Sequence, residues 1–420
     1  MFGWVGSILR INLTDGTAVS EPINERYAQE FIGRCALAMK YHSEECGPET
    51  EPFSKDNKVI FMTGPLTGTL GIGTAHFSIF AGKALTKGKE GPEYGDHFGA
   101  ELKYAGFDGL IIEGVAERPV YLEITDEGAR LLPANEIWGC GIEQSVAHTT
   151  MAAGFGARAC LIGPAGEKLS PFSCAVTDGG TSIGHGGIGA VMGSKRFKGI
   201  VVRGTNVIRV SEPAAYVDDV LSCRRALAAR EEIFRLSTES VTSVTTLQGG
   251  TEHLLKRHKA CFSCSIGCRY DFDVYGAILP CPTPETVSAF TSAGIRDAAI
   301  LIRANRLCLD YGLKPEACGH AVAYMIKTGS TDIALDNIET ILKQLADNTC
   351  RAEEAYEQSS PVPLTSADAL GVCSLCAAAL TKEELCEQFK MATGCPESSL
   401  EEAEERVALL EKLYTETDAN

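Results

Sequence analysis

The stretch Cys261-Phe262-Ser263-Cys264-Ser265-Ile266-Gly267-Cys268 carries three thiols on one short segment. On a loop of this length the three sulfur atoms can turn toward a common point, which is how proteins hold a cubane iron–sulfur cluster. A cluster of this kind takes its fourth cysteine from a distant part of the chain. The stretch therefore predicts a fold that brings one more cysteine to this loop.

The best donor of the fourth thiol is Cys373, in the segment Asp368-Ala369-Leu370-Gly371-Val372-Cys373-Ser374-Leu375-Cys376. One alternative is a zinc site made from two C-x-x-C pairs, Cys261 with Cys264 and Cys373 with Cys376. Zinc ribbons usually close the second pair roughly 15–20 residues after the first, whereas Cys373 follows Cys264 by 109 residues. Unrelated buried cysteines are the other alternative. We favour the cluster, because thiolate softness and the spacing both suit iron–sulfur ligation.

The composition is that of a globular chain and limits the class of partner. The 420 residues, 45% hydrophobic and 22% charged, suffice for two or three domains. The net charge of −17 argues against nucleic acid or an anionic membrane as a partner, and an acidic electron carrier would need a local basic patch. The 17 cysteines are too few for a disulfide scaffold, and no signal peptide is recognised at Met1. We therefore expect a cytoplasmic protein with reduced thiols and no membrane segment.

Short hydrophobic segments alternate with glycine-rich turns in the first half of the chain, and helical periodicity dominates the second half. The glycine-rich stretches 64–73 and 179–193 offer backbone N–H groups to an anionic cofactor. No internal repeat is evident. We predict an α+β fold, with a β-rich N-terminal domain over residues 1–205 that cradles a cofactor. A helical region over residues 206–420 then carries the iron–sulfur cluster.

Several motifs in one consistent order resemble the tungsten aldehyde:ferredoxin oxidoreductase family. The resemblance begins at Phe61-Met-Thr-Gly-Pro-Leu-Thr-Gly-Thr69 and is strongest at Phe98-Gly-Ala-Glu-Leu-Lys-Tyr-Ala-Gly-Phe-Asp-Gly-Leu-Ile-Ile-Glu-Gly114. It continues through residues 162–167 and 186–195, the cysteine loop, Asp310-Tyr-Gly312-Leu313, and the segment from Asp368 to Cys373. These matches extend from residue 4 to about residue 376 of the chain.

The resemblance implies a β-rich first domain that cradles a tungsten or molybdenum bis-pterin cofactor, covered by two helical domains. It implies a [4Fe-4S] cluster beside one pterin, with Cys261, Cys264, Cys268 and Cys373 as its ligands. In the family, two Asp-x-x-Gly motifs bind the pterins. The positions that this comparison assigns to pterin binding are Asp310, Gly312, Asp368 and Gly371.

The resemblance also implies an activity, the oxidation of a small aldehyde to a carboxylic acid. Electrons would leave through the cluster to ferredoxin or another electron-transfer protein. Glu285 matches a glutamate-bearing helix near the family's substrate pocket, and if buried beside the metal it would act as a general base. The alternative is a solvated glutamate in the first turn of a helix, favoured there by the helix dipole. Pro284 at the expected helix start suits this alternative.

Three departures from the family concern the binding of pterin phosphates. His76 and His185 stand where family members carry arginines, and Gly33-Arg34-Cys35-Ala36 replaces a Gly-Gly-Arg-Gly motif. A neutral histidine supplies neither the permanent charge nor the bidentate fork of arginine. Lys195 remains as a further source of positive charge. We therefore expect the pterin to be held more weakly here than in the family.

A large helical block of the family is missing between Gly329 and Asp368, so the helical region is shortened. That block closes the active site in the family. We expect the site either to be open to water or to be covered by a second copy or a partner subunit. A cluster-bearing relative without catalysis, which transfers electrons or serves as a structural subunit, is the alternative to an enzyme.

Overall fold

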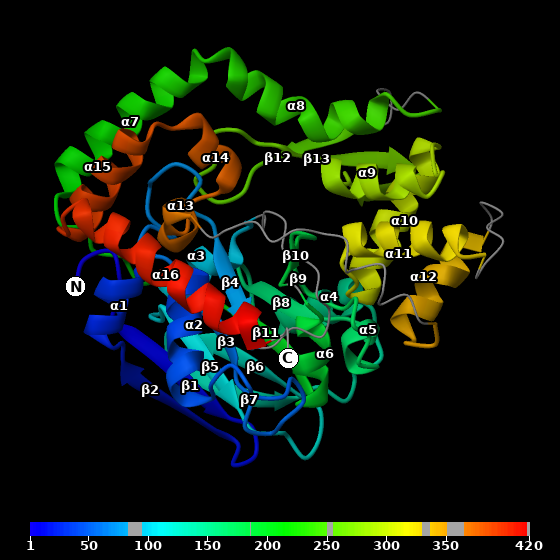
Figure 1. The fold of residues 1–420 in the computed structure, drawn as a ribbon, viewed down its shortest axis with the longest axis horizontal. Coiled ribbons are helices and arrows are strands. Elements are labelled where there is room, and N and C mark those ends of the chain that lie inside the picture. The colour runs from blue at the N-terminus through cyan, green and yellow to red at the C-terminus, as the bar shows by residue number, and fades with distance from the viewer. Residues whose placement is uncertain (83–94, 185, 250–254, 330–336, 351–364, 418–420) are drawn as a thin grey trace.

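Two β-sheets built from the first half of the chain form the centre of the molecule (Figure 1). The computed structural model describes residues 1–82, 95–184, 186–249, 255–329, 337–350 and 365–417. The central strands are β1 (Ser7–Asn12), β2 (Thr17–Pro22), β3 (Val59–Thr63), β4 (Phe77–Phe80), β5 (Gly109–Glu113), β6 (Val120–Thr125), β7 (Gly128–Pro133), β8 (Arg158–Ile162), β9 (Ala175–Thr177), β10 (Ser182–Ile183) and β11 (Phe197–Val202).

The two sheets have the same architecture. The first has the order β2-β1-β5-β3-β4, and the second, followed from its other end, has the order β7-β6-β11-β8-β9-β10. Each sheet contains one parallel pair of neighbouring strands, β1 with β5 in the first sheet and β6 with β11 in the second. The other strand pairs that correspond between the two sheets are antiparallel. The β-rich domain is thus an internal structural repeat with β10 added at one edge, although no repeat is evident in its sequence.

The strands are hydrophobic along their whole length because both faces of each sheet are covered. On β3 all five residues are buried. Phe61 faces a core shared between the two sheets, whereas Ile60 and Met62 face a second core on the outer side of the first sheet. Side chains on a strand alternate between its faces, so a strand covered on both sides shows no polar alternation.

Helices make up most of the second half and cover the sheets, so the predicted α+β class is confirmed. The helices are α1 (Glu25–Phe31), α2 (Arg34–Glu45), α3 (Phe98–Tyr104), α4 (Ile142–Ala153), α5 (Pro164–Glu167), α6 (Ile188–Ser194), α7 (Pro213–Ala228), α8 (Glu231–Thr245), α9 (Pro284–Ser292), α10 (Ala298–Tyr311), α11 (Pro315–Lys327), α12 (Ile338–Ala346), α13 (Ser366–Leu370), α14 (Ser374–Ala379), α15 (Lys382–Thr393) and α16 (Ser398–Thr417). Among the described helices, none is both long and apolar enough to cross a membrane.

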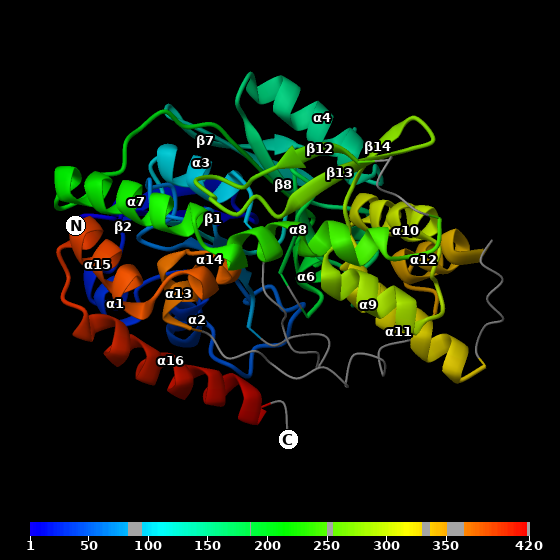
Figure 2. The same cartoon turned by 90° about the horizontal axis from the view of Figure 1, so that it is seen from above.

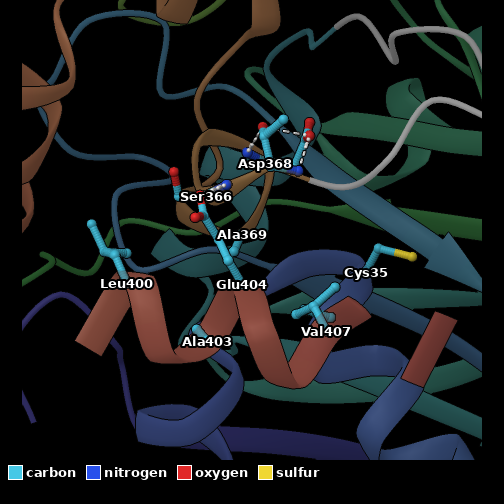
Figure 3. Close-up of a pocket in the computed structure, with 10 residues that line it drawn as sticks. Cys35, Ser366, Asp368, Ala369, Leu400, Ala403, Glu404 and Val407 are labelled. Carbon is cyan, nitrogen blue, oxygen red and sulfur yellow. Dashed lines mark hydrogen bonds between the residues drawn. The ribbon is translucent and has the colours of Figure 1, made fainter. Parts of the chain in front are cut away.

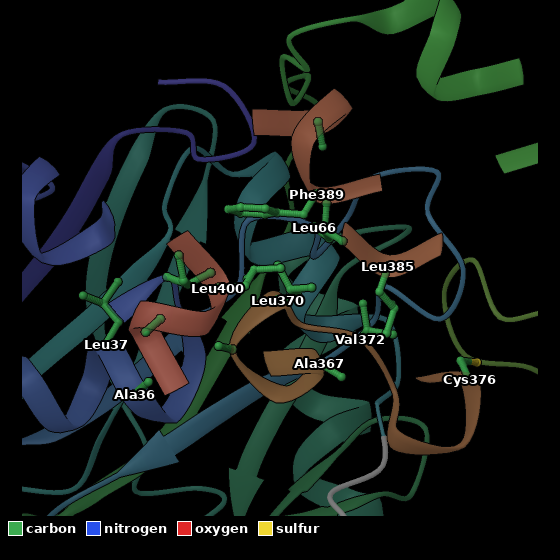
Figure 4. Close-up of a cluster of buried hydrophobic side chains, with 14 of the residues drawn as sticks. Ala36, Leu37, Leu66, Ala367, Leu370, Val372, Cys376, Leu385, Phe389 and Leu400 are labelled. Carbon is green, nitrogen blue, oxygen red and sulfur yellow. The ribbon is translucent and has the colours of Figure 1, made fainter. Parts of the chain in front are cut away.

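The second half forms two lobes on opposite sides of the β-rich domain, as Figures 1 and 2 both show. Helices α13 to α16 return to the N-terminal part of the chain and pack on the first sheet, in a core that includes Leu370, Phe389 and Leu400 (Figure 4). Helices α9 to α12 share a separate core with strands β13 (Arg269–Val274) and β14 (Ala277–Pro280). These strands, with β12 (Leu255–Lys259), form a third sheet that the sequence did not predict.

Each repeat of the β-rich domain holds the end of one helix from the second half. Gly64, after β3, lies against the backbone of Leu370 and Gly371 at the end of α13, and a Cβ atom on Gly64 would overlap both. Gly163, after β8, lies in the same way against Tyr311 and Gly312 at the end of α10. Both helices end in a left-handed glycine, with φ of 86° at Gly371 and 73° at Gly312. The two Gly-ended motifs therefore serve as matching contacts between the two halves.

Candidate metal centre

The cysteine loop connects β12 to β13 and is fixed to a glycine turn of the β-rich domain. Within the loop the Cys264 N–H donates to the Cys261 carbonyl over 3.2 Å, and Ser263 adopts a positive φ of 53°. The Gly73 N–H donates to the Ser263 carbonyl over 2.9 Å. The loop is therefore held in shape by hydrogen bonds both within itself and to the β-rich domain.

The same glycine turn brings Cys373 to the loop. The N–H of Cys373, at the N-cap of α14, donates to the Gly73 carbonyl over 3.0 Å. A Cβ atom on Gly73 would lie 2.5 Å from the Cys376 sulfur and 3.3 Å from the Cys373 Cβ, and Gly73 has a φ of 71°. Only glycine fits such a position without displacing its neighbours. Gly73 thus forms a cradle in which the two distant cysteine segments meet.

The geometry of the sulfur atoms bears on which cysteine would be the fourth cluster ligand. In the described ranges no three Cys, His, Asp or Glu side chains converge on one point as they do around a tetrahedral zinc ion. In a cubane each iron carries its own thiolate, which keeps the ligands farther apart. The Cys264 and Cys376 sulfur atoms are 4.0 Å apart, too close to belong to two different irons. The arrangement therefore suits Cys373 as the fourth ligand and Cys376 as its neighbour.

Three of the four proposed ligands have a hydrogen-bond donor beside them. Arg269 bonds to Cys261, Cys376 to Cys264, and His76 to Cys373. The contact with Cys376 lowers the pKa of Cys264 to about 7 and holds that of Cys373 well below its usual range, where His76 adds to the effect. Cys376 has a single S–H and donates to one of these sulfurs at a time. The environment thus favours thiolates, the form that binds metal, at Cys264 and Cys373. Burial acts in the opposite sense on the other two proposed ligands, raising the pKa of Cys268 to about 12 and that of Cys261 well above its usual range, so metal binding must supply the driving force for deprotonation there.

His76 was predicted to contact a pterin phosphate, and the structure places it beside Cys373, the proposed fourth cluster ligand. Its ring is buried, and its Nε2 accepts a hydrogen bond from the Gly95 N–H over 2.8 Å. A neutral imidazole that accepts at Nε2 carries its proton on Nδ1. This tautomer makes the His76 ring a donor toward the thiolate of Cys373. One indication in the sequence that His76 could donate a hydrogen bond here is that it replaces an arginine of the family, and both side chains carry N–H donors.

Replacing His76 with phenylalanine is expected to lower the reduction potential of the cluster. Donors to the cluster sulfurs stabilise the reduced, more negative state. A hydrogen bond to a charged group is worth roughly 1.5–3 kcal/mol, which limits the shift to about 65–130 mV for one electron. Redox titration followed by electron paramagnetic resonance measures the shift. His320→Phe, which changes an exposed histidine of α11, is the control. An unchanged potential in a fully loaded His76→Phe protein would contradict this role.

The two aspartates predicted to bind pterin are already bonded within the protein. Asp368 caps the start of its own helix through Thr365 and pairs with the buried Arg34 over 3.1 Å, beside a pocket between α2, α13 and α16 (Figure 3). Asp310 accepts a hydrogen bond from the N–H of Glu143 at the start of α4 over 3.0 Å. The two motifs also differ in spacing. Asp368 stands three residues before its glycine, whereas Leu309, and not Asp310, stands three before Gly312.

The remaining predicted residues lie elsewhere. The Lys195 ammonium donates to the carbonyls of Gly114 and Ser54, near the start of β3, whereas His76 lies beyond the other end of that strand. Burial lowers the pKa of Lys195 to about 8. Glu285 is exposed in the first turn of α9, and its role as a general base stays a prediction. His185 lies outside the described residues.

Sequence reasoning missed one residue of the centre, Arg269, and did not predict the structural roles of Arg34 and Cys376. The side chain of Arg269, which directly follows a ligand, bonds to Cys261 and pairs with Asp96 over 3.4 Å. Arg34 appeared only as part of an altered motif, yet it is buried against Asp368. Cys376 appeared only as a rival ligand. Adjacency to a ligand was the one signal that could have identified Arg269, since nothing in a sequence shows which distant side chains meet.

Comparison with protein families gives two matches along the chain. The model of the aldehyde ferredoxin oxidoreductase N-terminal domain matches residues 8–204, and that of domains 2 and 3 matches residues 228–358. The described segment from α13 to α16, with Cys373, follows these matches. Its assignment to the metal centre therefore depends on the geometry given above.

Curated relatives include the tungsten-containing aldehyde ferredoxin oxidoreductases of Pyrococcus abyssi and Pyrococcus furiosus. The first is 33% identical over 77% of this chain and 58% of its own length, and the second 29% identical over 85% and 68%. The WOR-like subunit of an aliphatic sulfonate oxidoreductase from Pyrococcus furiosus is 30% identical over 49% of this chain and 35% of its own length. The chain thus spans little more than half of the Pyrococcus abyssi relative.

Among solved structures, the active-site complex BamBC of benzoyl coenzyme A reductase superposes with a TM-score of 0.69. The match covers 87% of this chain and 67% of that chain at 21% sequence identity. This likeness concerns the fold alone.

Proposed function

Because the chain belongs to the aldehyde ferredoxin oxidoreductase family, we propose that it is an oxidoreductase whose electrons pass through a [4Fe-4S] cluster on Cys261, Cys264, Cys268 and Cys373. The observation that carries the proposal is the meeting of two cysteine segments across Gly73. They are separated in sequence, and the thiols lie among hydrogen-bond donors. A cluster supplies one-electron transfer, for which protein side chains have no equivalent.

The reaction we propose is oxidation of an aldehyde to a carboxylic acid at a tungsten or molybdenum bis-pterin centre, with ferredoxin as the acceptor. The metal would accept the two electrons of the substrate. This chain's own part is to hold the cluster, to orient its thiolates through Arg269, Cys376 and His76, and to shield them partly from solvent. Family membership supports the pterin centre, but the described pterin candidates lie at separate places and are bonded within the protein. We therefore derive no step through it.

The internal hydrogen bonds and ion pairs of the pterin candidates favour a second function. With Asp310, Asp368 and Lys195 already engaged, the chain would serve as a cluster-bearing electron-transfer subunit without its own pterin. In this function the cluster and its donors are retained, and the oxidation of the substrate takes place in a partner.

Metal and pterin analysis of anaerobically purified protein distinguishes the two functions. The enzyme is expected to contain about four irons per chain, together with tungsten or molybdenum and pterin, and to reduce a viologen dye when an aldehyde is added. Four irons without pterin, before and after reconstitution with the cofactor, would support the electron-transfer subunit and contradict the enzyme. Protein that binds no iron under any of these conditions would contradict both.

A further inference from the structure

Strand β12 forms an exposed basic surface on an acidic protein. The chain has a net charge of −17. The sequence of β12 is Leu-Lys-Arg-His-Lys, and its first four residues are exposed. It is one of the two edge strands of the β12-β13-β14 sheet (Figure 2). Lysine on an edge strand can serve simply to discourage edge-to-edge aggregation. The position of β12 relative to the proposed cluster therefore decides between that role and a role in binding.

The charges of β12 are only partly neutralised. Arg257 and Lys259 both pair with the buried Asp271, over 2.9 and 2.8 Å. Lys256 lies 3.9 Å from Asp273. Three cationic side chains thus pair with two carboxylates, and the buried carboxylate of Asp271 lies between two of the cations. The surface that solvent reaches is therefore positive at this strand.

The basic strand leads directly into the metal centre. Lys259 is followed by Ala260 and the first proposed ligand, Cys261, and residues 261–265 are only partly buried. On the other side of the loop, the Arg224 guanidinium of α7 donates to the Ser263 hydroxyl over 2.6 Å. Positive charge therefore flanks the most accessible part of the cluster loop on two sides.

We propose that β12 and Arg224 form the docking surface for an acidic electron-transfer protein, and that electrons leave through the loop of Cys261. The proposal depends on the cluster of the proposed function. One electron passes from the reduced cluster to the oxidised carrier, and no bond or proton is exchanged. An acidic carrier is repelled by the rest of this chain, so a local positive surface steers it to the one place where transfer can occur.

The test is the rate at which the dithionite-reduced protein reduces an acidic ferredoxin, followed by stopped flow without any aldehyde. In the variant Lys256→Gln with Arg257→Gln, Lys259 still pairs with Asp271. We expect its second-order rate constant at low ionic strength to fall about tenfold, and added salt to reduce the difference from the unaltered protein. The control, Lys327→Gln with Lys343→Gln, removes the same charge from exposed positions on α11 and α12 and is expected to stay within about twofold.

A basic acceptor, cytochrome c, supplies the opposite comparison, and its rate with the β12 variant should not fall. Equal rates for the two variants with ferredoxin would overturn the proposal. So would a variant that changes only its oligomeric state in size-exclusion chromatography, because that result assigns the lysines to protection of the edge strand. A protein that shows no cluster signal before mixing contradicts the proposed function instead, so the two failures are distinguishable.

Discussion

Cys373→Ser is expected to reduce the iron content from about four per chain to three or fewer and to abolish the spectrum of the intact cubane. The serine hydroxyl is a poor ligand for iron–sulfur clusters because it lacks the soft thiolate. The substitution tests ligation and little else, since Cys373 is the N-cap of α14 and serine is a preferred N-cap residue. Iron analysis, visible absorption and electron paramagnetic resonance measure the result.

Cys376→Ala is the matched control for this experiment. Cys376 is fully buried in the same core and contacts the same glycine, and alanine keeps its surroundings apolar. The variant is expected to retain four irons, with a lower reduction potential, because one donor to Cys264 is lost. If Cys376→Ala loses the cluster while Cys373→Ser keeps it, Cys376 is the fourth ligand. Stoichiometric zinc with no iron in the unaltered protein would contradict the cluster itself.

Gly64→Ala and Gly163→Ala are each expected to reduce the free energy of unfolding by about 3 kcal/mol or more. At both positions the added Cβ would overlap backbone atoms, of Leu370 and Gly371 in one case and of Tyr311 and Gly312 in the other. Backbone cannot move aside as a flexible side chain does, so the helix end must shift away from the sheet. Thermal and urea-induced unfolding of the protein in a fixed cluster state measure the loss.

The two glycine variants should differ in one respect. Gly64 contacts the end of α13, which leads into Cys373, whereas Gly163 contacts α10 in the other lobe. Gly64→Ala is therefore expected to lose iron as well as stability, and Gly163→Ala to lose stability alone. Gly106→Ala serves as the control. It has a φ of 96° and no atom within 4 Å of the added Cβ, so it costs only about 1–2 kcal/mol of backbone strain. A milder effect at Gly64 than at Gly106 would refute the close contact.

The sequence predicted most of the elements that a strong local pattern specifies. Hydrophobic patterning predicts a strand over residues 59–63 and a helix over residues 284–293, and these coincide with β3 and α9 to within a residue. The patterning also predicts one helix over residues 26–41, but the structure breaks it at Ile32 and Gly33, where Gly33 comes within contact of Gly64 and Ala369. Strand β12 was missed because its five residues show no hydrophobic alternation, which normally identifies a strand. In both the broken helix and β12, contacts with distant parts of the chain determine the secondary structure, and the local sequence pattern does not.

The candidate site likewise has a part that the sequence predicted and a part that it did not. Spacing alone indicated the cysteine triplet, because the three ligands share one loop. It did not indicate Arg269 or His76 as partners of the thiols, since those contacts form only when distant segments pack. Lys195 was assigned to the cofactor from an aligned motif, yet its ammonium is bonded to carbonyl groups near the far end of β3. An alignment transfers residue types and does not show where a long side chain extends.

The internal repeat has a consequence for how a metal site is gained or lost. After Gly371 and Val372 comes Cys373, whose N–H donates to Gly73; after Gly312 and Leu313 comes Lys314, whose N–H donates to Phe172. Corresponding backbone positions of the two repeats thus bear a thiol, the proposed metal ligand, in one copy and an ammonium group in the other. The backbone frame therefore does not itself determine which chemistry this position carries. A lineage can exchange the side chain at such a position and change its redox capability while the folded chain persists.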